Sequence, residues 1–134
     1  TSQEQELRRP AIEFLDMVGL ENRAEFVAGQ LSHGEHRQLE IAMALATNPK
    51  MLLLDEPMAG MGPKESQAIV KILQKLKRKL TILLIEHDMD VVFKLADRIT
   101  VLVNGRGIAT DIPDAIKKNQ KVIAAYLGEE SYHA

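Results

Sequence analysis

Two carboxylates follow directly on the apolar run Met51–Leu54, in the stretch MLLLDEP. Such a run is typical of a strand buried on both faces, and side chains after it lie at the carboxyl edge of a sheet, where open α/β sheets bind ligands. Mg²⁺ often takes one carboxylate together with phosphates and waters, a role that suits Asp55 directly or through water. Glu56 would then polarise an attacking water. A plain polar turn is the alternative, which the four apolar residues before the pair and Pro57 after it disfavour.

A histidine follows the next apolar run, in the stretch TILLIEHD of residues 81–88. If the two strands are parallel, His87 emerges at the same edge as Glu56. It could there donate a hydrogen bond to a γ-phosphate or orient the water. A lone histidine is usually structural, and Asp88 could simply cap the next helix. The order and spacing of the motifs together favour the chemical role.

The stretch LSHGEHRQLEIAMAL, residues 31–45, begins a helix that could hold an anion. Ser32 and Glu35 have the spacing of a capping box, in which each side chain bonds to the other's backbone amide. The same helix start could bind a phosphate, because its dipole favours negative charge and Gly34 lets the backbone approach closely. Taken alone the structural role is favoured, and the motifs downstream decide between the two.

The hydrophobic pattern places these motifs on an α/β fold, with a parallel sheet and a small antiparallel addition. Asn104-Gly105 is a strong hairpin signal. The expected strands cover residues 51–54, 81–85, 99–103 and 107–110. Three helices are expected in the first half: residues 3–18, a helix that starts at 32 and stops before Asn48-Pro49, and a helix that starts at 63. Three more are expected at residues 89–96, 113–118 and 121–127.

Helical spacing also predicts which side chains face the core. The helix from residue 63 is expected to turn Ile69, Leu73 and Leu76 inward. The apolar face of the helix before Asn48 is expected to consist of Leu39, Ala42, Met43 and Ala46.

Composition sets further limits. The chain has 134 residues, a formal net charge of −2 and no cysteine, so it shows no basic footprint for nucleic acid and cannot form disulfides. Its apolar runs, such as MLLL and ILLI, are short. A membrane span needs about 20 residues, so we expect no transmembrane helix, and no signal peptide is visible.

Together, LSHGE, MLLLDEP and the histidine after TILLIE resemble the signature, Walker B and switch-histidine motifs of ABC-transporter ATPases. The resemblance covers nearly the whole chain. The stretches DEPMAGMGPKES, LIEHDMDVVFKLADRITVLVNGRGIA and VIAAYLGEE are most similar to the branched-chain amino acid uptake subfamily, with urea-type relatives close. This implies the C-terminal part of a P-loop NTPase (RecA-like) domain. Residues 1–48 would be part of the helical signature subdomain, and residues 49–134 part of the ATPase core with C-terminal helices.

The resemblance implies a role for each motif. Asp55 would serve Mg²⁺, Glu56 would be the catalytic carboxylate, and His87 would contact the γ-phosphate. The signature would contact an ATP held by the opposite subunit of a head-to-tail dimer, through Leu31, Ser32, His33, Gly34 and Glu35. The loop that crosses the dimer interface would comprise Ala59, Gly60, Met61 and Gly62.

The chain departs from the family pattern at three positions. The signature usually reads Leu-Ser-Gly/Tyr-Gly-Gln, whereas His33 and Glu35 fill its third and fifth places. A carboxylate near a phosphate should weaken binding unless Glu35 turns back into the capping box. Gly62 stands where Asp or Asn is usual.

The sequence also lacks a phosphate-binding loop, Gly-x-x-x-x-Gly-Lys-Ser/Thr. The nearest match, Gly29 to Gly34, continues without a lysine. In the family this loop and the Q-loop belong to the half that precedes this one, so we expect a fragment that is inactive alone. Without the strand that would lie beside residues 51–54, a sheet edge and apolar surface would be exposed, and we expect self-association or marginal stability.

The expected parent is an ATP-binding and ATP-hydrolysing subunit of an ABC importer for branched-chain amino acids. It would use ATP and Mg²⁺, pair with a second ATPase subunit, and dock on transmembrane permease subunits. Its location would be cytoplasmic, peripheral at the inner face of the plasma membrane. The alternative is a non-catalytic ABC-like interaction module, which the missing phosphate-binding loop favours for this chain alone.

Overall fold

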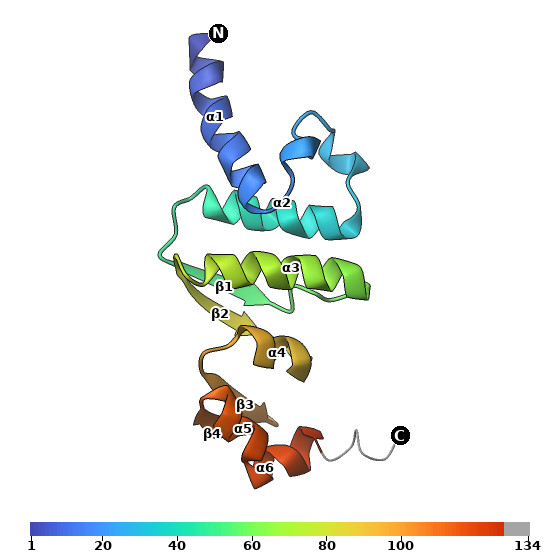
Figure 1. The fold of residues 1–134 in the computed structure, drawn as a ribbon, viewed down its shortest axis with the longest axis vertical. Helices are drawn as coiled ribbons and strands as arrows, with labels where there is room; N and C mark the ends of the chain where they lie inside the picture. The colour runs from blue at the N-terminus through green and yellow to red at the C-terminus, as the bar shows by residue number, and fades with distance from the viewer. Residues whose placement is uncertain (128–134) are drawn as a thin grey trace. The chain divides into compact units, whose positions relative to one another are not determined.

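The computed structural model describes residues 1–127, in two compact units divided between His87 and Asp88 (Figure 1). The first unit has helices α1 (Ser2–Met17), α2 (His33–Leu45) and α3 (Pro63–Leu76), turns η1 (Glu21–Arg23) and η2 (Ala28–Gln30), and strands β1 (Met51–Asp55) and β2 (Thr81–Ile85). The second has helices α4 (Met89–Leu95), α5 (Pro113–Lys118) and α6 (Gln120–Val122), strands β3 (Ile99–Val103) and β4 (Arg106–Asp111), and the closing turn η3 (Ile123–Leu127).

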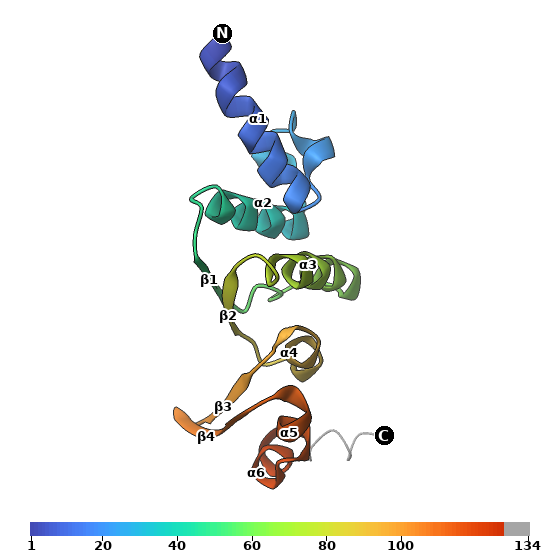
Figure 2. The same ribbon diagram turned by 60° about the vertical axis from the view of Figure 1, so that its left-hand side comes forward.

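Strands β1 and β2 pair in parallel, with Asp55 opposite Ile85 at their carboxyl ends. Helix α3 connects them and lies along one side of the pair (Figure 1, Figure 2). Pro63 occupies the first turn of α3, where its missing N–H costs nothing. The predicted inward face of this helix is confirmed, since Ile69, Leu73 and Leu76 are all buried. The parallel pairing predicted from the element order is confirmed as well.

The other face of the β1–β2 pair is exposed in the described part of the chain. Alternate residues of a strand share one face. On this face four apolar side chains are exposed: Met51, Leu53, Leu83 and Ile85. The prediction that the apolar runs are buried on both faces is therefore wrong for the described residues, because α3 covers one face alone. The predicted apolar surface is confirmed.

The apolar face of α2 differs from the predicted one. The helix buries Ile41, Ala42 and Leu45, whereas Met43 is 64% exposed and Ala46 is also exposed. The prediction holds for Ala42 and is wrong for Met43 and Ala46, because the inward stripe contains a polar residue. The Gln38 side chain lies on that stripe and donates a hydrogen bond to the Val18 carbonyl at 2.9 Å.

The second unit is built on the predicted hairpin. Strands β3 and β4 are antiparallel, and both turn residues, Asn104 and Gly105, have positive φ, as the tight turn of a two-residue hairpin requires. The predicted helix over 121–127 is confirmed, as the short α6 followed by the π-helical turn η3. The core of this unit comprises Ile99, Val101, Ile116 and Val122.

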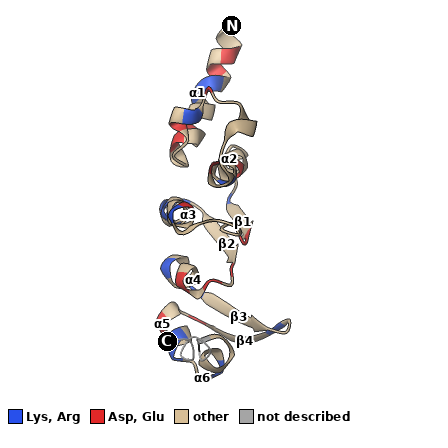
Figure 3. Cartoon of the chain, turned by 90° about the vertical axis from the view of Figure 1, so that its right-hand side faces the viewer, with Lys and Arg blue, Asp and Glu red and all other residues tan. Residues whose placement is uncertain are grey.

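Charged residues of both signs occur along α1 and α3, without a block of one sign on either helix (Figure 3). This distribution agrees with the small net charge. Among the described residues, no helix combines the length and the apolar character that crossing a membrane requires.

Candidate functional site

The predicted proximity of Glu56 and His87 is confirmed. His87 Nδ1 lies 3.0 Å from Glu56 Oε1, beyond the carboxyl ends of β1 and β2. Both side chains face solvent, His87 being 77% exposed and Glu56 47%. The parallel register brings them together, since each follows its strand by one or two residues. The pair is therefore accessible to a ligand at this edge of the sheet.

The backbone at Glu56 makes the turn that ends β1. Its φ is 45°, in the left-handed region that residues other than glycine rarely adopt. Its N–H donates to the Ile85 carbonyl at 2.9 Å, which extends the strand pairing by one residue. The next residue, Pro57, is buried and directs the chain away. These contacts fix where the Glu56 side chain leaves the sheet.

The contact with Glu56 limits what the His87 ring can do. A carboxylate without its proton only accepts hydrogen bonds, so with Glu56 in that form the shared hydrogen is the one on Nδ1. In a neutral ring Nε2 is then an acceptor. A ring that keeps this bond and also donates to a phosphate through Nε2 must carry both hydrogens, and hence a positive charge.

Asp55 is exposed at the last position of β1, one residue before Glu56. No group of three or more His, Asp or Glu among residues 1–127 could hold a metal by itself. A lone carboxylate fits a Mg²⁺ whose remaining ligands are waters and phosphate oxygens, the arrangement that this ion commonly adopts. The donor at this edge therefore suits a metal that arrives with a nucleotide.

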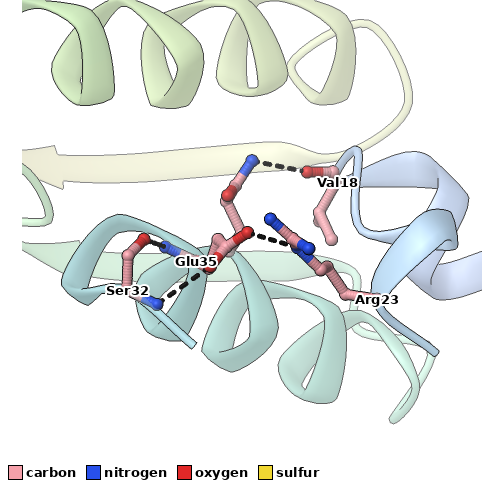
Figure 4. Close-up of polar contacts among 5 residues, drawn as sticks. Val18, Arg23, Ser32 and Glu35 are labelled. Carbon is pink, nitrogen blue, oxygen red and sulfur yellow. Dashed lines mark hydrogen bonds and ion pairs between the residues drawn. The ribbon is translucent and has the colours of Figure 1, made fainter. Parts of the chain in front are cut away.

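The predicted capping box at the start of α2 is confirmed (Figure 4). The Ser32 N–H donates to Glu35 Oε2 at 2.9 Å, and the Glu35 N–H donates to Ser32 Oγ at 3.2 Å. Glu35 thus turns back towards its own helix, which is the condition under which its charge was expected to be tolerated. The box occupies the amides of Ser32 and Glu35. It does not use the amides of His33 and Gly34, which are the first two residues of the helix.

Arg23 is a partner of Glu35 that the sequence did not predict. Its Nε donates to Glu35 Oε1 at 2.7 Å (Figure 4). The hydrogen bond from the Ser32 amide, followed by the bond from Arg23, lowers the pKa of the Glu35 carboxyl below its usual 4.5. The two residues are 12 apart and come from different elements, so no helical or strand periodicity links them. The one available signal was chemical: a carboxylate at a candidate anion site needs a cation nearby.

Gly34 has a second structural reason to be glycine. A side chain at this position would begin 3.1 to 3.2 Å from the Glu65 carboxyl group, which α3 brings against α2. The Glu65 carboxylate also accepts a hydrogen bond from the Gly62 N–H at 3.3 Å, at the start of α3. The close approach of α3 is therefore a structural reason for glycine at position 34. It is independent of the expectation that Gly34 lets a phosphate approach the backbone.

The signature segment contacts the loop of residues 59–62. His33 Nε2 lies 3.2 Å from the carbonyl oxygen of Ala59, within hydrogen-bonding distance. In the same loop Gly60 has a φ of 75°, a conformation that favours glycine. Met61 donates its N–H to the Met58 carbonyl at 3.1 Å, which closes a turn. The residue at the third place of the signature thus connects two segments predicted to act at an interface.

An open hollow of about 370 Å³ lies between the starts of α2 and α3. Its lining includes two basic residues, Arg23 and Lys64, and two acidic ones, Glu35 and Glu65. Ser32 and Gly34 also line it. The four charged side chains together contribute no net charge to its lining.

Two family models match the sequence. The model described as ABC transporter matches residues 1–59, and the model described as branched-chain amino acid ATP-binding cassette transporter matches residues 108–132. Both matches agree with the resemblance found in the motifs.

Curated relatives match most of the chain. The high-affinity branched-chain amino acid transport ATP-binding protein BraF of Pseudomonas aeruginosa is 42% identical over 128 residues, 94% of this chain and 50% of that protein. The protein LivG of Escherichia coli K12, which has the same description, is 43% identical over 121 residues, 89% of this chain and 48% of that protein. The chain spans about half the length of the curated relatives it matches.

Solved structures match the fold. The ADP conformation of MJ1267, described as an ATP-binding cassette of an ABC transporter, has a TM-score of 0.78 and 35% identity, covering 90% of this chain and 49% of that one. The structure of cbiO1 from Clostridium perfringens, described as part of the ABC transporter complex cbiONQ, has a TM-score of 0.78 and 32% identity, covering 91% of this chain and 49% of that one.

Proposed function

Because the chain belongs to the ATP-binding family of ABC transporters, we propose that it is the carboxyl-terminal part of an ATP-hydrolysing subunit of an importer for branched-chain amino acids. The solute class is taken from the names of the relatives and from the second family model. The observation that carries the catalytic proposal is the Glu56–His87 pair, 3.0 Å apart and exposed at the carboxyl edge of the β1–β2 sheet.

In this proposal Glu56 accepts a hydrogen bond from the attacking water and takes its proton, and His87 holds Glu56 in place. When His87 is doubly protonated, Nε2 can also donate to the γ-phosphate. Asp55 would hold Mg²⁺ directly or through water, and a bound ion would supply neutralisation of the phosphate charges.

The signature segment acts on the nucleotide of a second subunit. We propose that Leu31, Ser32, His33, Gly34 and Glu35 face the ATP held by the opposite subunit of a head-to-tail dimer. The loop that crosses this interface consists of Ala59, Gly60, Met61 and Gly62. The hydrogen-bonding distance between His33 and the Ala59 carbonyl supports a coupled movement of these two segments.

In this scheme residues 1–48 belong to the helical signature subdomain and residues 49–134 to the ATPase core. The subunit lies on the cytoplasmic side, peripheral at the inner face of the plasma membrane through its permease subunits. The sequence contains no Gly-x-x-x-x-Gly-Lys-Ser/Thr, so the chain alone is expected to be inactive. That same absence favours the second candidate function, a non-catalytic interaction module.

The test uses the chain fused behind the amino-terminal half of the Pseudomonas relative. The fused protein should hydrolyse Mg-ATP, and Glu56→Gln should lower kcat at least about 100-fold, because a positioned general base contributes that much. The matched control is Glu13→Gln, an exposed carboxylate on α1, which should leave kcat unchanged. The chain without the fusion should be silent.

Two results would count against the proposal. Full activity in Glu56→Gln would remove the assigned role of that residue. A well-folded fusion that neither binds nor hydrolyses Mg-ATP would favour the non-catalytic module.

A further inference from the structure

The signature of this chain contains a carboxylate where its family usually has a neutral amide. Glu35 lies in the first turn of α2, beside the amides proposed to face a phosphate. An ionised carboxylate there repels a phosphate and also satisfies part of the positive end of the helix dipole. A working site must cancel this charge or move it away.

Both oxygens of that carboxylate are engaged. Oε2 accepts from the Ser32 amide at 2.9 Å, and Oε1 accepts from Arg23 at 2.7 Å. The Glu35 side chain is 22% exposed and that of Arg23 45%. The charge of Glu35 is therefore held by the Ser32 amide and matched by an opposite charge at contact distance.

Arg23 is itself held in place. It ends the turn η1, and its guanidinium carbon lies 4.7 Å from the centre of the Phe26 ring, a cation–π contact. A side chain anchored on an aromatic ring loses less entropy when it makes an ion pair than a freely moving one does. Arg23 is thus prepared to meet Glu35.

The Ser32 hydroxyl gains from this arrangement. Its oxygen accepts from the Glu35 amide, which leaves the hydroxyl hydrogen available for an outside acceptor. Together with the amides of His33 and Gly34, it can form three donors around one anion. If Glu35 left the capping box, the box would open and the Ser32 side chain would lose its orientation.

We propose that Arg23 is a positioning residue of the signature: it holds and neutralises Glu35, so that the start of α2 can accept the phosphate of the opposite subunit's nucleotide. This inference rests on the proposed function, since it needs the nucleotide-bound dimer. Arg23 acts only through Glu35 and does not touch the phosphate.

The first experiment uses the chain itself. Titration of the Glu35 carboxylate, followed by its carbon-13 NMR shift, should show a higher midpoint in Arg23→Met than in the parent, and Arg23→Lys should restore part of the difference. An unchanged midpoint in Arg23→Met would overturn the coupling between the two residues.

The second experiment uses the fused protein with Glu56→Gln, in which ATP should accumulate the dimer without hydrolysis. Arg23→Met should raise the ATP concentration for half-maximal dimer formation about tenfold, the equivalent of about 1.4 kcal/mol. When Glu35→Gln is added, the same Arg23 change should have less than about a twofold effect, because no charge is left to neutralise. Thermal melting of every variant checks that the fold is retained.

The outcomes separate the two proposals. If the parent fusion forms no ATP-dependent dimer, the proposed function fails. If the dimer forms and Arg23→Met weakens it equally with and without Glu35→Gln, Arg23 does not act through Glu35 and this inference is overturned.

Discussion

At the scale of single residues, the chemistry of this chain depends on side chains whose charges are held by specific neighbours. Glu56 is bonded to His87, and Glu35 is bonded to Ser32 and Arg23. The first pair was predictable, because both residues follow apolar runs that had to become adjacent parallel strands. The Arg23 contact was not predictable from local pattern, because it depends on how the chain folds back between α1 and α2.

The bonds to Glu35 predict a pH dependence of stability. The pKa of Glu35 in the folded chain is lowered below 4.5 by the Ser32 amide and by Arg23. In the unfolded chain the pKa of Glu35 is about 4.5. The stabilisation that ionised Glu35 gives to the fold is therefore fully present above about pH 4.5, and it is lost as the pH falls through the lower pKa of the folded chain.

Urea unfolding should therefore show that Glu35→Gln lowers the free energy of unfolding at pH 7, and that its difference from the parent shrinks below pH 4 or so. Met43→Gln, an exposed change on the same helix that adds no titrating group, is the control. A difference between Glu35→Gln and the parent that stays constant with pH would contradict the assignment.

At the scale of elements, the sequence predicted most helices and strands, because their signals are local. Periodic apolar residues, Pro63 at a helix start and Asn104-Gly105 in a hairpin each act within a few residues. The inward face of α2 was mistaken in part because Gln38 lies half-buried on it and donates to the Val18 carbonyl, a partner outside any local pattern. For the same reason, the approach of Glu65 to Gly34 was not predictable.

The contact between α2 and α3 at Gly34 gives a second prediction. Gly34→Ala places a methyl group against the Glu65 side chain, so it should destabilise the chain although alanine favours helix. Adding Glu65→Ala should make room and recover the melting temperature relative to Glu65→Ala alone. If Gly34→Ala stabilises the chain with Glu65 present, the contact is not tight.

The two faces of the strand pair give a third prediction. Leu73→Ala removes a buried side chain on α3 and should lower the free energy of unfolding by about 2–5 kcal/mol. Leu53→Ala makes the same chemical change at a position that is 67% exposed, and should cost much less. Equal losses, measured by denaturant unfolding at concentrations too low for self-association, would contradict the exposure of Leu53.

At the scale of the whole molecule, the chain corresponds to about half of BraF and of the MJ1267 cassette. Parallel sheets are normally covered on both faces. Here the described residues of the first unit cover one face of β1–β2 and leave apolar side chains on the other. The sequence predicted this apolar surface from the resemblance to the family, which implies a further strand beside β1.

That surface should make the chain self-associate. Analytical ultracentrifugation should detect species larger than a monomer, and Leu53→Lys together with Leu83→Lys should shift them towards the monomer, because charges oppose burial of the face. Leu7→Lys, at an exposed position on α1, should have little effect. A parent chain that sediments as a compact monomer with a high melting temperature would refute this prediction.

Glu56 makes the turn after β1 with a left-handed backbone, at a φ of 45°. A residue with a side chain adopts that conformation at a cost of about 1–2 kcal/mol, which glycine avoids. The chain thus accepts a less favourable residue at the end of β1. A glycine at this position would avoid that cost but would also remove the carboxylate that contacts His87, so the contact depends on this strained residue.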